Sequence, residues 1–180
     1  MNERKTLTQH IHVTWILIAD GKRAQVYECH KNMHKIPLGR ANTHHYFDEK
    51  LGYGLLEVPQ GTLEAESVND YQIGHDRRGT SSSSNSPTRN TYEPHGDIKE
   101  ELKRRFTRTI ADKLEHACTG KLFDRLILVA PAKMIGDLRE HLAIDVRDRI
   151  AAVLPKDLMH FQIRELLPHL QDTLAEAQVA

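Results

Sequence analysis

The chain has 180 residues, of which 39% are hydrophobic and 28% charged, a composition typical of a single globular domain over 1–180 and not of a disordered segment. Its 25 basic and 25 acidic side chains give a formal net charge of zero, which excludes an overall basic surface of the kind that binds nucleic acid. We therefore expect no DNA partner and, at most, a local basic patch.

The N-terminal part predicts an antiparallel β-sheet. Residues 13–19 (VTWILIA) form a continuous apolar run, which indicates a strand buried on both faces. Asp20-Gly21 follows, and residues 23–29 (RAQVYEC) then alternate apolar with polar side chains. Because glycine tolerates the positive φ of tight turns, this pattern predicts a hairpin. A third strand within 36–47 would complete an antiparallel meander.

The stretch 52–96 differs in composition from the rest of the chain. Its tract 79–90 (GTSSSSNSPTRN) holds no large apolar residue, so it cannot contribute to a hydrophobic core. We therefore predict a mobile loop over about 74–91. A loop of this length inside a compact domain is uncommon and is either functional or disordered.

The second half of the chain alternates helix and strand patterns. Apolar side chains recur every fourth residue over 97–120, with Asp97 as N-cap, Glu100 completing a capping box and Gly120 as a left-handed end. The next apolar run predicts a strand over 123–130. Beyond it, the patterns predict helices over 132–141 and 145–153, a short strand over 157–161 and a final helix over 163–177.

This order of elements indicates an α/β protein. Strands that are separated by helices pair in parallel through right-handed crossovers. The strand over 13–19 would then lie centrally, beside the strand over 123–130. The order is that of a ribonuclease-H-like three-layer fold, with a mixed five-stranded sheet and helices on both faces. The alternative is another three-layer α/β arrangement.

Cysteine usage and hydropathy both bear on location. Cys29 and Cys118 lie in different predicted elements and form no disulfide framework, which fits a reducing compartment. Residues 1–12 lack the apolar segment of a signal peptide, and the longest apolar run, 13–19, is too short to span a bilayer. We therefore expect a cytoplasmic, soluble protein with no membrane insertion.

Several segments together resemble the bacterial host attachment protein family, the proteins required for attachment to host cells. The resemblance covers roughly 13–170 in order, which makes it more specific than any single motif. It is carried by TWILIADGKRAQVY (14–27), Asp76-Arg77-Arg78-Gly79, Tyr92-Glu93-Pro94 leading to Lys103-Arg104-Arg105-Phe106, FDRLILVAPAKMIGDLR (123–139) and KDLMH (156–160).

The resemblance implies a fold more firmly than an activity. The family is named for a plant-cell attachment phenotype and has no firmly assigned enzymatic activity. Its implied relationship is to the middle domain of archaeo-eukaryotic peptide-chain release factors, a ribonuclease-H-like domain. The chain departs from the family pattern in the loop, where Arg78 replaces a proline, a serine run follows, and Asn90 stands in place of a histidine.

Asp20 is the first catalytic candidate. In ribonuclease-H-like nucleases a carboxylate on the first strand helps to hold two metal ions. Further carboxylates would have to converge on it, and Glu100 or Glu101 are the candidates, whereas the strand that ends before Pro131 brings no acid there. We favour the alternative that Asp20 is simply the first residue of an Asp-Gly turn.

Twelve histidines invite a search for metal sites. Cys29, His30 and His34 lie close together in the sequence, as do His44 and His45, but no CxxC or HExxH spacing occurs. We therefore predict no metal site. Neither GxxxxGK[ST] nor GxGxxG is present, so we also predict no nucleotide or other cofactor.

A basic cluster lies on the helix predicted over 97–120 and consists of Lys103, Arg104, Arg105 and Arg108. Positions 104 and 108 share one helix face, so two guanidinium groups there would be placed to bind RNA phosphates. Acidic side chains at helical spacing would neutralise them by ion pairs. A solvated helix face is therefore the alternative that we favour.

Lys156, Asp157 and His160 form a second catalytic candidate, because a Lys–Asp pair would orient the imidazole as a general base. No serine or cysteine nucleophile can be paired with His160 from the sequence, and the G-x-S-x-G elbow is missing. Ordinary turn and edge-strand residues are the alternative interpretation of these three side chains.

We therefore predict a non-enzymatic protein that binds an unidentified protein partner. Its expected binding surface combines Asp76, Arg77 and Arg78 of the loop with the helix face at Arg104, Arg105 and Arg108. The first alternative is a factor associated with the ribosome or with RNA, motivated by the release-factor relationship and the basic helix. The second alternative is a hydrolase or nuclease that uses Asp20 or His160.

Overall fold

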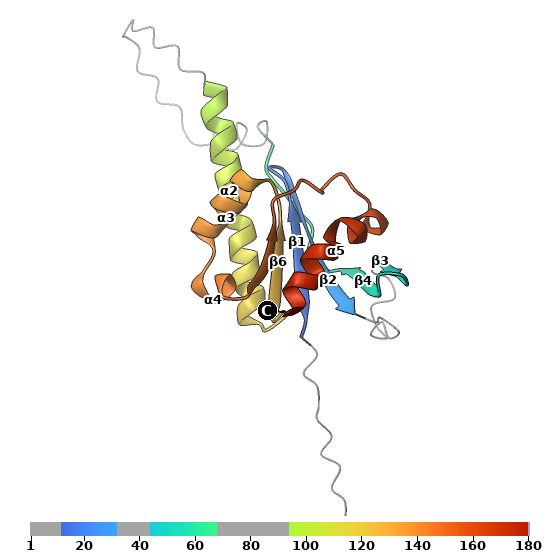
Figure 1. The fold of residues 1–180 in the computed structure, drawn as a ribbon. Helices are drawn as coiled ribbons and strands as arrows, with labels where there is room; N and C mark the ends of the chain where they lie inside the picture. Colours follow the sequence, from blue (N-terminus) through green and yellow to red (C-terminus); the bar gives the residue numbers. More distant parts are fainter. Residues whose placement is uncertain (1–11, 32–43, 68–93, 180) are drawn as a thin grey trace, which may run out of the picture.

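The computed structural model describes residues 12–31, 44–67 and 94–179 (Figure 1). Within these ranges the chain forms a mixed seven-stranded sheet and four helices. The strands are β1 (Thr14–Ala19), β2 (Arg23–Lys31), β3 (His45–Asp48), β4 (Tyr53–Glu57), β5 (Leu63–Glu64), β6 (Arg125–Val129) and β7 (Ile150–Leu154). The helices are α2 (Pro94–Thr119), α3 (Ala132–His141), α4 (Ile144–Arg147) and α5 (Ile163–Val179).

The strand β1 lies at the centre of the sheet, as its continuous apolar run predicts. It pairs antiparallel with β2 on one side and parallel with β6 on the other. Alternate β1 side chains enter opposite layers, because successive side chains of a strand point to opposite faces. Trp15 and Leu17 pack against one helical layer, and Ile16 and Ile18 pack against the other.

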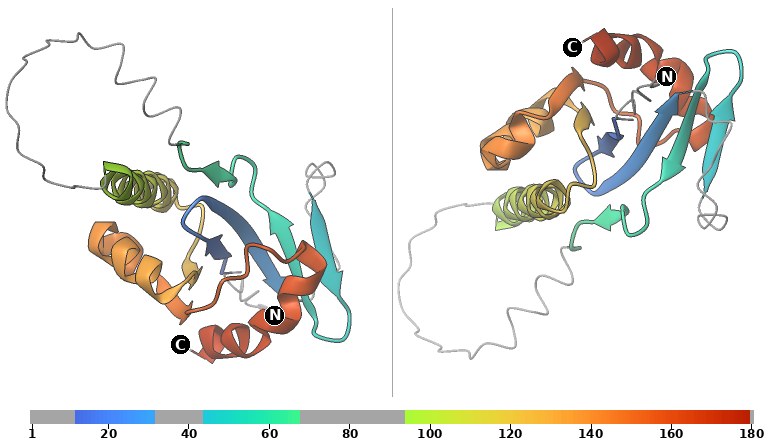
Figure 2. Two further views of the ribbon diagram at one scale, coloured as in Figure 1. Left: turned by 90° about the horizontal axis from the view of Figure 1, so that it is seen from above. Right: turned by 90° about the horizontal axis from the view of Figure 1, so that it is seen from below.

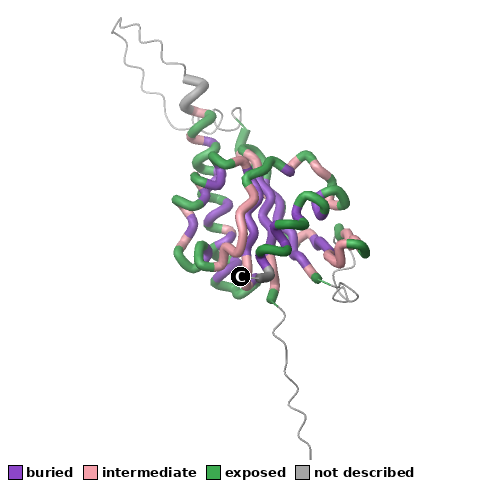
Figure 3. The backbone as a smooth tube through the Cα atoms, viewed as in Figure 1, coloured by how far each residue is buried: buried purple, intermediate pink, exposed green. Residues whose placement is uncertain are grey.

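Helices cover both faces of the sheet, which gives three layers (Figure 2). On one face, α2 contributes Phe106, Ile110 and Leu114 to the core, and α3 and α4 pack beside it. On the other face, α5 places its leucines against β1, β2 and β6; these are Leu166, Leu167, Leu170 and Leu174. The central strands β1 and β6 are the most deeply buried of the described elements (Figure 3).

The order of the sheet is β3-β4-β2-β1-β6-β7, with β5 paired to the remaining part of β2. The predicted meander is therefore wrong in one respect, because β4 and not the third strand lies beside β2. The third strand is β3, which pairs with β4, and residues 32–43 lie outside the described part of the chain. The stretch 52–96 also contains β4 and β5, and the loop predicted over about 74–91 lies outside the described residues.

The C-terminal half needs a second correction. The apolar run Ile150–Leu154 forms an edge strand, β7, parallel to β6, and the helix before it is only the single turn α4. The two alanines at 151 and 152 favour a helix in isolation, but pairing with β6 decides the outcome. Residues 157–161 form a turn and no strand. The sheet therefore has seven strands among the described residues, and not five.

The ends of helix α2 also differ from the prediction. The helix begins at Pro94, so Asp97 lies inside it and is not its N-cap. At its other end, the left-handed residue is Lys121, with φ of 53°, and not Gly120. The backbone N–H of Leu122 donates to the carbonyl of Ala117 at 3.0 Å, which closes the helix in the way of a Schellman end.

The helices predicted over 132–141 and 163–177 are confirmed as α3 and α5. Pro168 lies inside α5, near its beginning, where the missing N–H removes one helical hydrogen bond. No helix in the described part of the chain combines the length and the apolar character that crossing a membrane requires.

Candidate functional site

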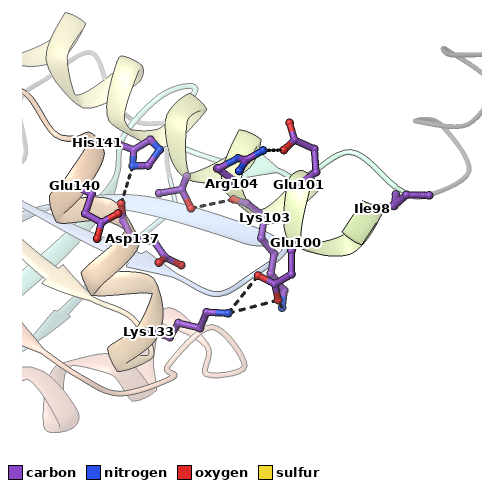
Figure 4. A pocket seen from close by; sticks show the side chains of 10 residues that line it. Ile98, Glu100, Glu101, Lys103, Arg104, Lys133, Asp137, Glu140 and His141 are labelled. Atoms are coloured by element: carbon purple, nitrogen blue, oxygen red, sulfur yellow. Dashed lines mark hydrogen bonds and ion pairs between the residues drawn. The ribbon is translucent and has the colours of Figure 1, made fainter. Parts of the chain in front are cut away.

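A cleft of about 590 Å³ lies between the N-terminal half of α2 and helix α3 (Figure 4). Most of the side chains that line it are charged. They are Ile98, Glu100, Glu101, Lys103, Arg104 and Thr107 from α2 and Lys133, Asp137, Glu140 and His141 from α3. The cleft therefore offers carboxylates and cations to the same occupant.

Helical periodicity explains why α2 presents its charges to this cleft. Leu102, Phe106 and Ile110 recur every fourth residue and are buried against the sheet. Glu100, on another side of the helix, is therefore left exposed. Helix α3 begins directly after Pro131, at the carboxyl end of β6, and runs beside α2 so that its own charged face closes the cleft.

Glu100 connects the two helices electrostatically. Its carboxylate lies 3.3 Å from Lys103 Nζ on α2 and 3.2 Å from Lys133 Nζ on α3 (Figure 4). The hydrogen bond from Lys133, then the one from Lys103, hold the pKa of Glu100 below its ordinary value. All three side chains are more than half exposed, so these ion pairs contribute little to stability. Their effect is to orient the charged side chains that line the cleft.

The predicted basic face of α2 is partly neutralised. Glu101 accepts from Arg104, and its other oxygen lies 3.1 Å from Arg105 Nε. Arg108 is exposed and does not line the cleft. Of the three arginines predicted as one binding face, the structure places Arg104 in the cleft, while Arg105 and Arg108 lie outside its lining.

Helix α3 supplies the part of the cleft that sequence reasoning missed. Lys133, Asp137, Glu140 and His141 share one side of this helix, at spacings of three and four residues. That spacing is visible in the sequence and would have indicated a charged helix face. The His141 imidazole Nδ1 donates to the carbonyl of Asp137 at 3.0 Å, which fixes the orientation of its ring.

Asp20 lies at the carboxyl end of β1, in the turn to β2. Its Oδ1 accepts from the backbone N–H groups of Lys22 and Arg23, both at 2.7 Å. The backbone N–H of Asp20 donates to the carbonyl of Arg23 at 2.8 Å, which completes the turn. The carboxylate therefore has the full set of contacts that a structural turn residue needs.

Two substitutions test whether Asp20 is a structural residue of the turn. Asp20→Ala removes an acceptor for two backbone donors and should lower the free energy of unfolding by about 1–2 kcal/mol. Asp20→Asn keeps an oxygen at the same place and should cost less than half as much. Urea unfolding followed by circular dichroism measures both values. Equal losses in the two variants would contradict the turn role.

Lys156, Asp157 and His160 lie together in the turn that follows β7, but they do not form a hydrogen-bonded relay. The Asp157 Oδ1 accepts from the backbone N–H of Met159 at 3.2 Å. The His160 ring lies 4.2 Å from the ring of Phe161, centroid to centroid. All three predicted residues are exposed.

The remaining predicted site residues, Asp76, Arg77 and Arg78, lie outside the described residues, as does the serine-rich tract. Within the described ranges, no three histidine, cysteine, aspartate or glutamate side chains are grouped so that they would hold a metal ion. Of the predicted site residues that the structure describes, Arg104 lines the cleft, as do Glu100 and Glu101, the carboxylates considered as partners of Asp20. Asp20 and His160 lie in separate turns.

Comparison with known proteins identifies the family. No curated protein matches the sequence. A family model described as "Protein required for attachment to host cells" matches residues 15–170, a range that includes β1, the cleft between α2 and α3, and the beginning of α5. Because this range is well over half of the chain, the protein belongs to the family of proteins required for attachment to host cells.

Proposed function

We propose that this member of the host-attachment family is a non-enzymatic binding protein, and that its partner is a protein that docks in the cleft between α2 and α3. The observation that carries the proposal is the cleft itself, in which Lys133, Glu100 and Lys103 form a chain of opposite charges. Such a surface complements a partner that carries charged side chains of both signs.

The charges of the cleft favour a protein over RNA. An RNA-binding face neutralises phosphates with unpaired cations. Here Arg104 already pairs with Glu101, and Glu140 and Asp137 add negative charge to the opposite wall. Phosphates entering the cleft would meet these carboxylates, whereas a protein partner would pair with both signs.

The positions of the catalytic candidates support a non-enzymatic role. Asp20 and Asp157 each use a carboxylate oxygen to bind backbone N–H groups of their own turns. The His160 ring packs against the Phe161 ring at an interplanar angle of 38° and has no carboxylate partner among the described residues. General acid–base catalysis needs a group within hydrogen-bond reach of its partner. Asp20 lies in a different turn from Asp157 and His160, and the Asp157 carboxylate bonds to the backbone of its own turn and not to His160.

The proposed fold relationship is to ribonuclease-H-like domains, and through them to the middle domain of release factors. It is supported by the central part of the sheet, where β4, β2 and β1 are antiparallel and β6 and β7 follow in parallel. We also propose a cytoplasmic location, which is supported by the two cysteines being buried and free of a disulfide. Asp76, Arg77 and Arg78 stay a proposed extension of the binding surface.

Charge reversals on α3 test the proposal. The tagged protein is cross-linked in cells, its partner is identified by mass spectrometry, and the affinity of the purified pair is measured. Lys133→Glu and Glu140→Lys reverse one cation and one anion of the cleft, and each should weaken binding about 3–10-fold. Arg139→Glu is the matched control, because Arg139 is exposed on the same helix but does not line the cleft.

Sedimentation of the cell lysate distinguishes the RNA alternative. The protein should migrate apart from ribosomal fractions, and RNase should leave its position unchanged. Co-migration with ribosomes that is lost after RNase treatment would support the alternative and contradict the proposal. Equal affinity of the partner for wild type and both cleft variants would also contradict it.

A further inference from the structure

The cleft between α2 and α3 continues past Lys103 toward the turn between β1 and β2. A second pocket, of about 210 Å³, adjoins the cleft and shares Lys103, Thr107, Lys133 and Asp137 with it. A third pocket, of about 420 Å³, shares Gly21 and Lys103 with the second. Because each pocket shares lining residues with the next, the three form one groove, and Lys103 lines each of them.

The third pocket is the basic end of this groove. Its charged side chains are Lys22 from the turn after β1, Lys99 and Lys103 from α2, and Glu66, which follows β5. Lys103 has Glu100 as its partner, but neither Lys22 nor Lys99 forms an ion pair with any residue that the structure describes. Lys99 and Lys103 also lie four residues apart on one helix face, where like charges repel each other. This end therefore carries positive charge that its own carboxylates do not fully neutralise.

The other end of the groove has more acidic side chains. There α3 contributes Asp137 and Glu140 and, as a cation, Lys133. The electrostatic character thus changes along the groove, from positive near the turn after β1 to mixed charge along α3. Complementary charges fix which part of a partner lies at which end. An acidic segment of a partner would lie over Lys22 and Lys99.

Gly21 leaves the groove open where the second and third pockets meet. It lines both pockets, and its φ is not in the left-handed region, so the backbone does not require a glycine at this position. A Cβ here would lie 3.7 Å from Lys103 Cε, an ordinary contact, whereas a larger side chain would extend into the space beside that lysine. The missing side chain therefore gives a partner room to approach the backbone closely.

We propose that this groove binds an extended acidic segment of the protein partner. Its carboxylates pair with Lys22, Lys99 and Lys103, and its backbone passes over Gly21. This assignment rests on the proposed function, because the groove includes the cleft in which the partner docks, and it adds the chemistry of the segment that is recognised. Such charge pairs supply specificity and a fast association rate more than affinity.

The lining favours a peptide over single-stranded RNA. Proteins that bind single strands stack the bases on accessible aromatic side chains. Among the described residues that line the three pockets, Phe106 is the one phenylalanine, tyrosine or tryptophan, and it is only 4% exposed. An acidic peptide needs no stacking surface, because its carboxylates can pair with exposed lysines.

Fluorescence anisotropy with a fluorescein-labelled octaglutamate peptide measures binding to the full-length protein at about 50 mM salt. The peptide should bind saturably with a Kd below about 1 mM, and an octaserine peptide with the same label should bind at least about fivefold more weakly. Raising the salt to about 500 mM should weaken octaglutamate binding, because salt screens the attraction between exposed charges.

Charge reversals at the basic end test the lysines. Lys22→Glu and Lys99→Glu should each weaken octaglutamate binding about 3–10-fold. Lys50→Glu is the matched control, because Lys50 is an exposed lysine that lines none of the three pockets. It changes the net charge by the same amount and should alter the affinity by less than about twofold.

Filling the groove at Gly21 tests the path of the segment. Gly21→Trp places a large side chain beside Lys103 and should weaken octaglutamate binding at least about fivefold. Gly136→Trp is its control, because Gly136 is also exposed and lines none of the three pockets. Urea unfolding shows whether both variants are folded.

Three outcomes would overturn the proposal. They are the absence of saturation below about 10 mM octaglutamate, charge reversals at Lys22 and Lys99 that have no more effect than Lys50→Glu, and tighter binding of octauridylate than of octaglutamate at the same lysines. The last result would assign the groove to RNA.

The acidic segment and the proposed function fail separately. Absence of octaglutamate binding, together with loss of the protein partner in Lys133→Glu, would remove the acidic segment and leave the proposed function standing. Octaglutamate binding that depends on Lys22 and Lys99, together with a partner that binds wild type and both α3 variants equally, would contradict the proposed function and keep the basic end as a peptide site.

Discussion

Gly61→Ala is expected to lower the free energy of unfolding by about 2–4 kcal/mol, because the new methyl group has no space. A Cβ at this position would lie 2.7 Å from the carbonyl oxygen of Val58 and 3.1 Å from that of Val26. Both oxygens belong to the backbone, so a side-chain rotation cannot relieve the contact. The loop between β4 and β5 would have to move away from β2.

Such a movement would break the hydrogen bonds that attach this loop to the sheet. The backbone N–H of Val26 donates to the carbonyl of Gly61 at 3.1 Å, and that of Val58 donates to the carbonyl of Val26 at 3.0 Å. Gln60 holds the turn between them with φ of 59°, a conformation that few residues other than glycine adopt at low cost. The loop therefore has one arrangement in which β4 and β5 both pair with β2.

Gly136→Ala is the matched control, since the same methyl group is added to a glycine with nothing within 4 Å of the new atom. Gly136 is exposed inside α3, where alanine is the better helix former. This variant should raise the free energy of unfolding by about 0.5–1 kcal/mol. Urea unfolding of both variants measures the two changes in the free energy of unfolding. A Gly61→Ala protein as stable as wild type would contradict the tight packing of the loop.

The elements that the sequence predicts correctly are those whose local signal agrees with the tertiary structure. The β1–β2 hairpin combines a continuous apolar run, an Asp-Gly turn and an alternating strand, and the structure pairs Thr14 with Cys29 and Ala19 with Ala24. The helices α3 and α5 have a regular apolar stripe. In each case the apolar side chains follow the periodicity of a strand or of a helix clearly, and not both. The type of element can therefore be assigned without knowing which residues pack against it.

The elements that the sequence does not predict depend on neighbours. The short strand β4 contains Gly54, which normally weakens a strand, and it forms because β2 and β3 pair with it on both sides. The strand β7 contains two alanines and lies at the edge of the sheet, where all of its side chains are only partly buried. Its strand character comes from pairing with β6.

The charged cleft was only partly accessible to sequence analysis. Arg104 belongs to a basic cluster that is visible in the sequence, and the charged face of α3 could be found from its helical spacing. That these faces meet, through Glu100 and Lys133, is a property of how α2 and α3 pack. No local sequence pattern indicates that contact, because the two residues are separated by 33 positions along the chain.

Alkaline pH is expected to destabilise the protein through two buried acids on β2. Burial raises the pKa of the Cys29 thiol from 9.0 to about 12. Burial and, to a smaller extent, the charge of Glu57 raise the pKa of the Tyr27 hydroxyl from 10.0 to about 12. Both side chains face α5, where they are less than 9% exposed, so the folded protein keeps them neutral while the unfolded chain ionises them.

The sign follows from proton binding. Above pH 9 the folded state holds a proton on Cys29 that the unfolded chain releases, and above pH 10 the same holds for Tyr27. The free energy of unfolding therefore keeps its full value below pH 9 and falls as the pH rises toward 12. Each group lowers it by at most about 1.4 kcal/mol per pH unit. Between pH 10 and 12 the two groups together contribute a slope of up to about 2.7 kcal/mol per unit.

Urea unfolding at a series of pH values from 7 to 11.5 measures this slope, and two substitutions assign it. Tyr27→Phe removes one ionisable group with little change in shape and should flatten the loss above pH 10, while Cys29→Val should flatten the loss that begins at pH 9. Each variant also changes packing, but a packing effect is the same at every pH and therefore shifts the curve without changing its slope. A double variant that loses stability as steeply as wild type would show that other groups cause the alkaline unfolding. It would also show that water reaches these two acids on the α5 side of β2, although Tyr27 and Cys29 are less than 9% exposed.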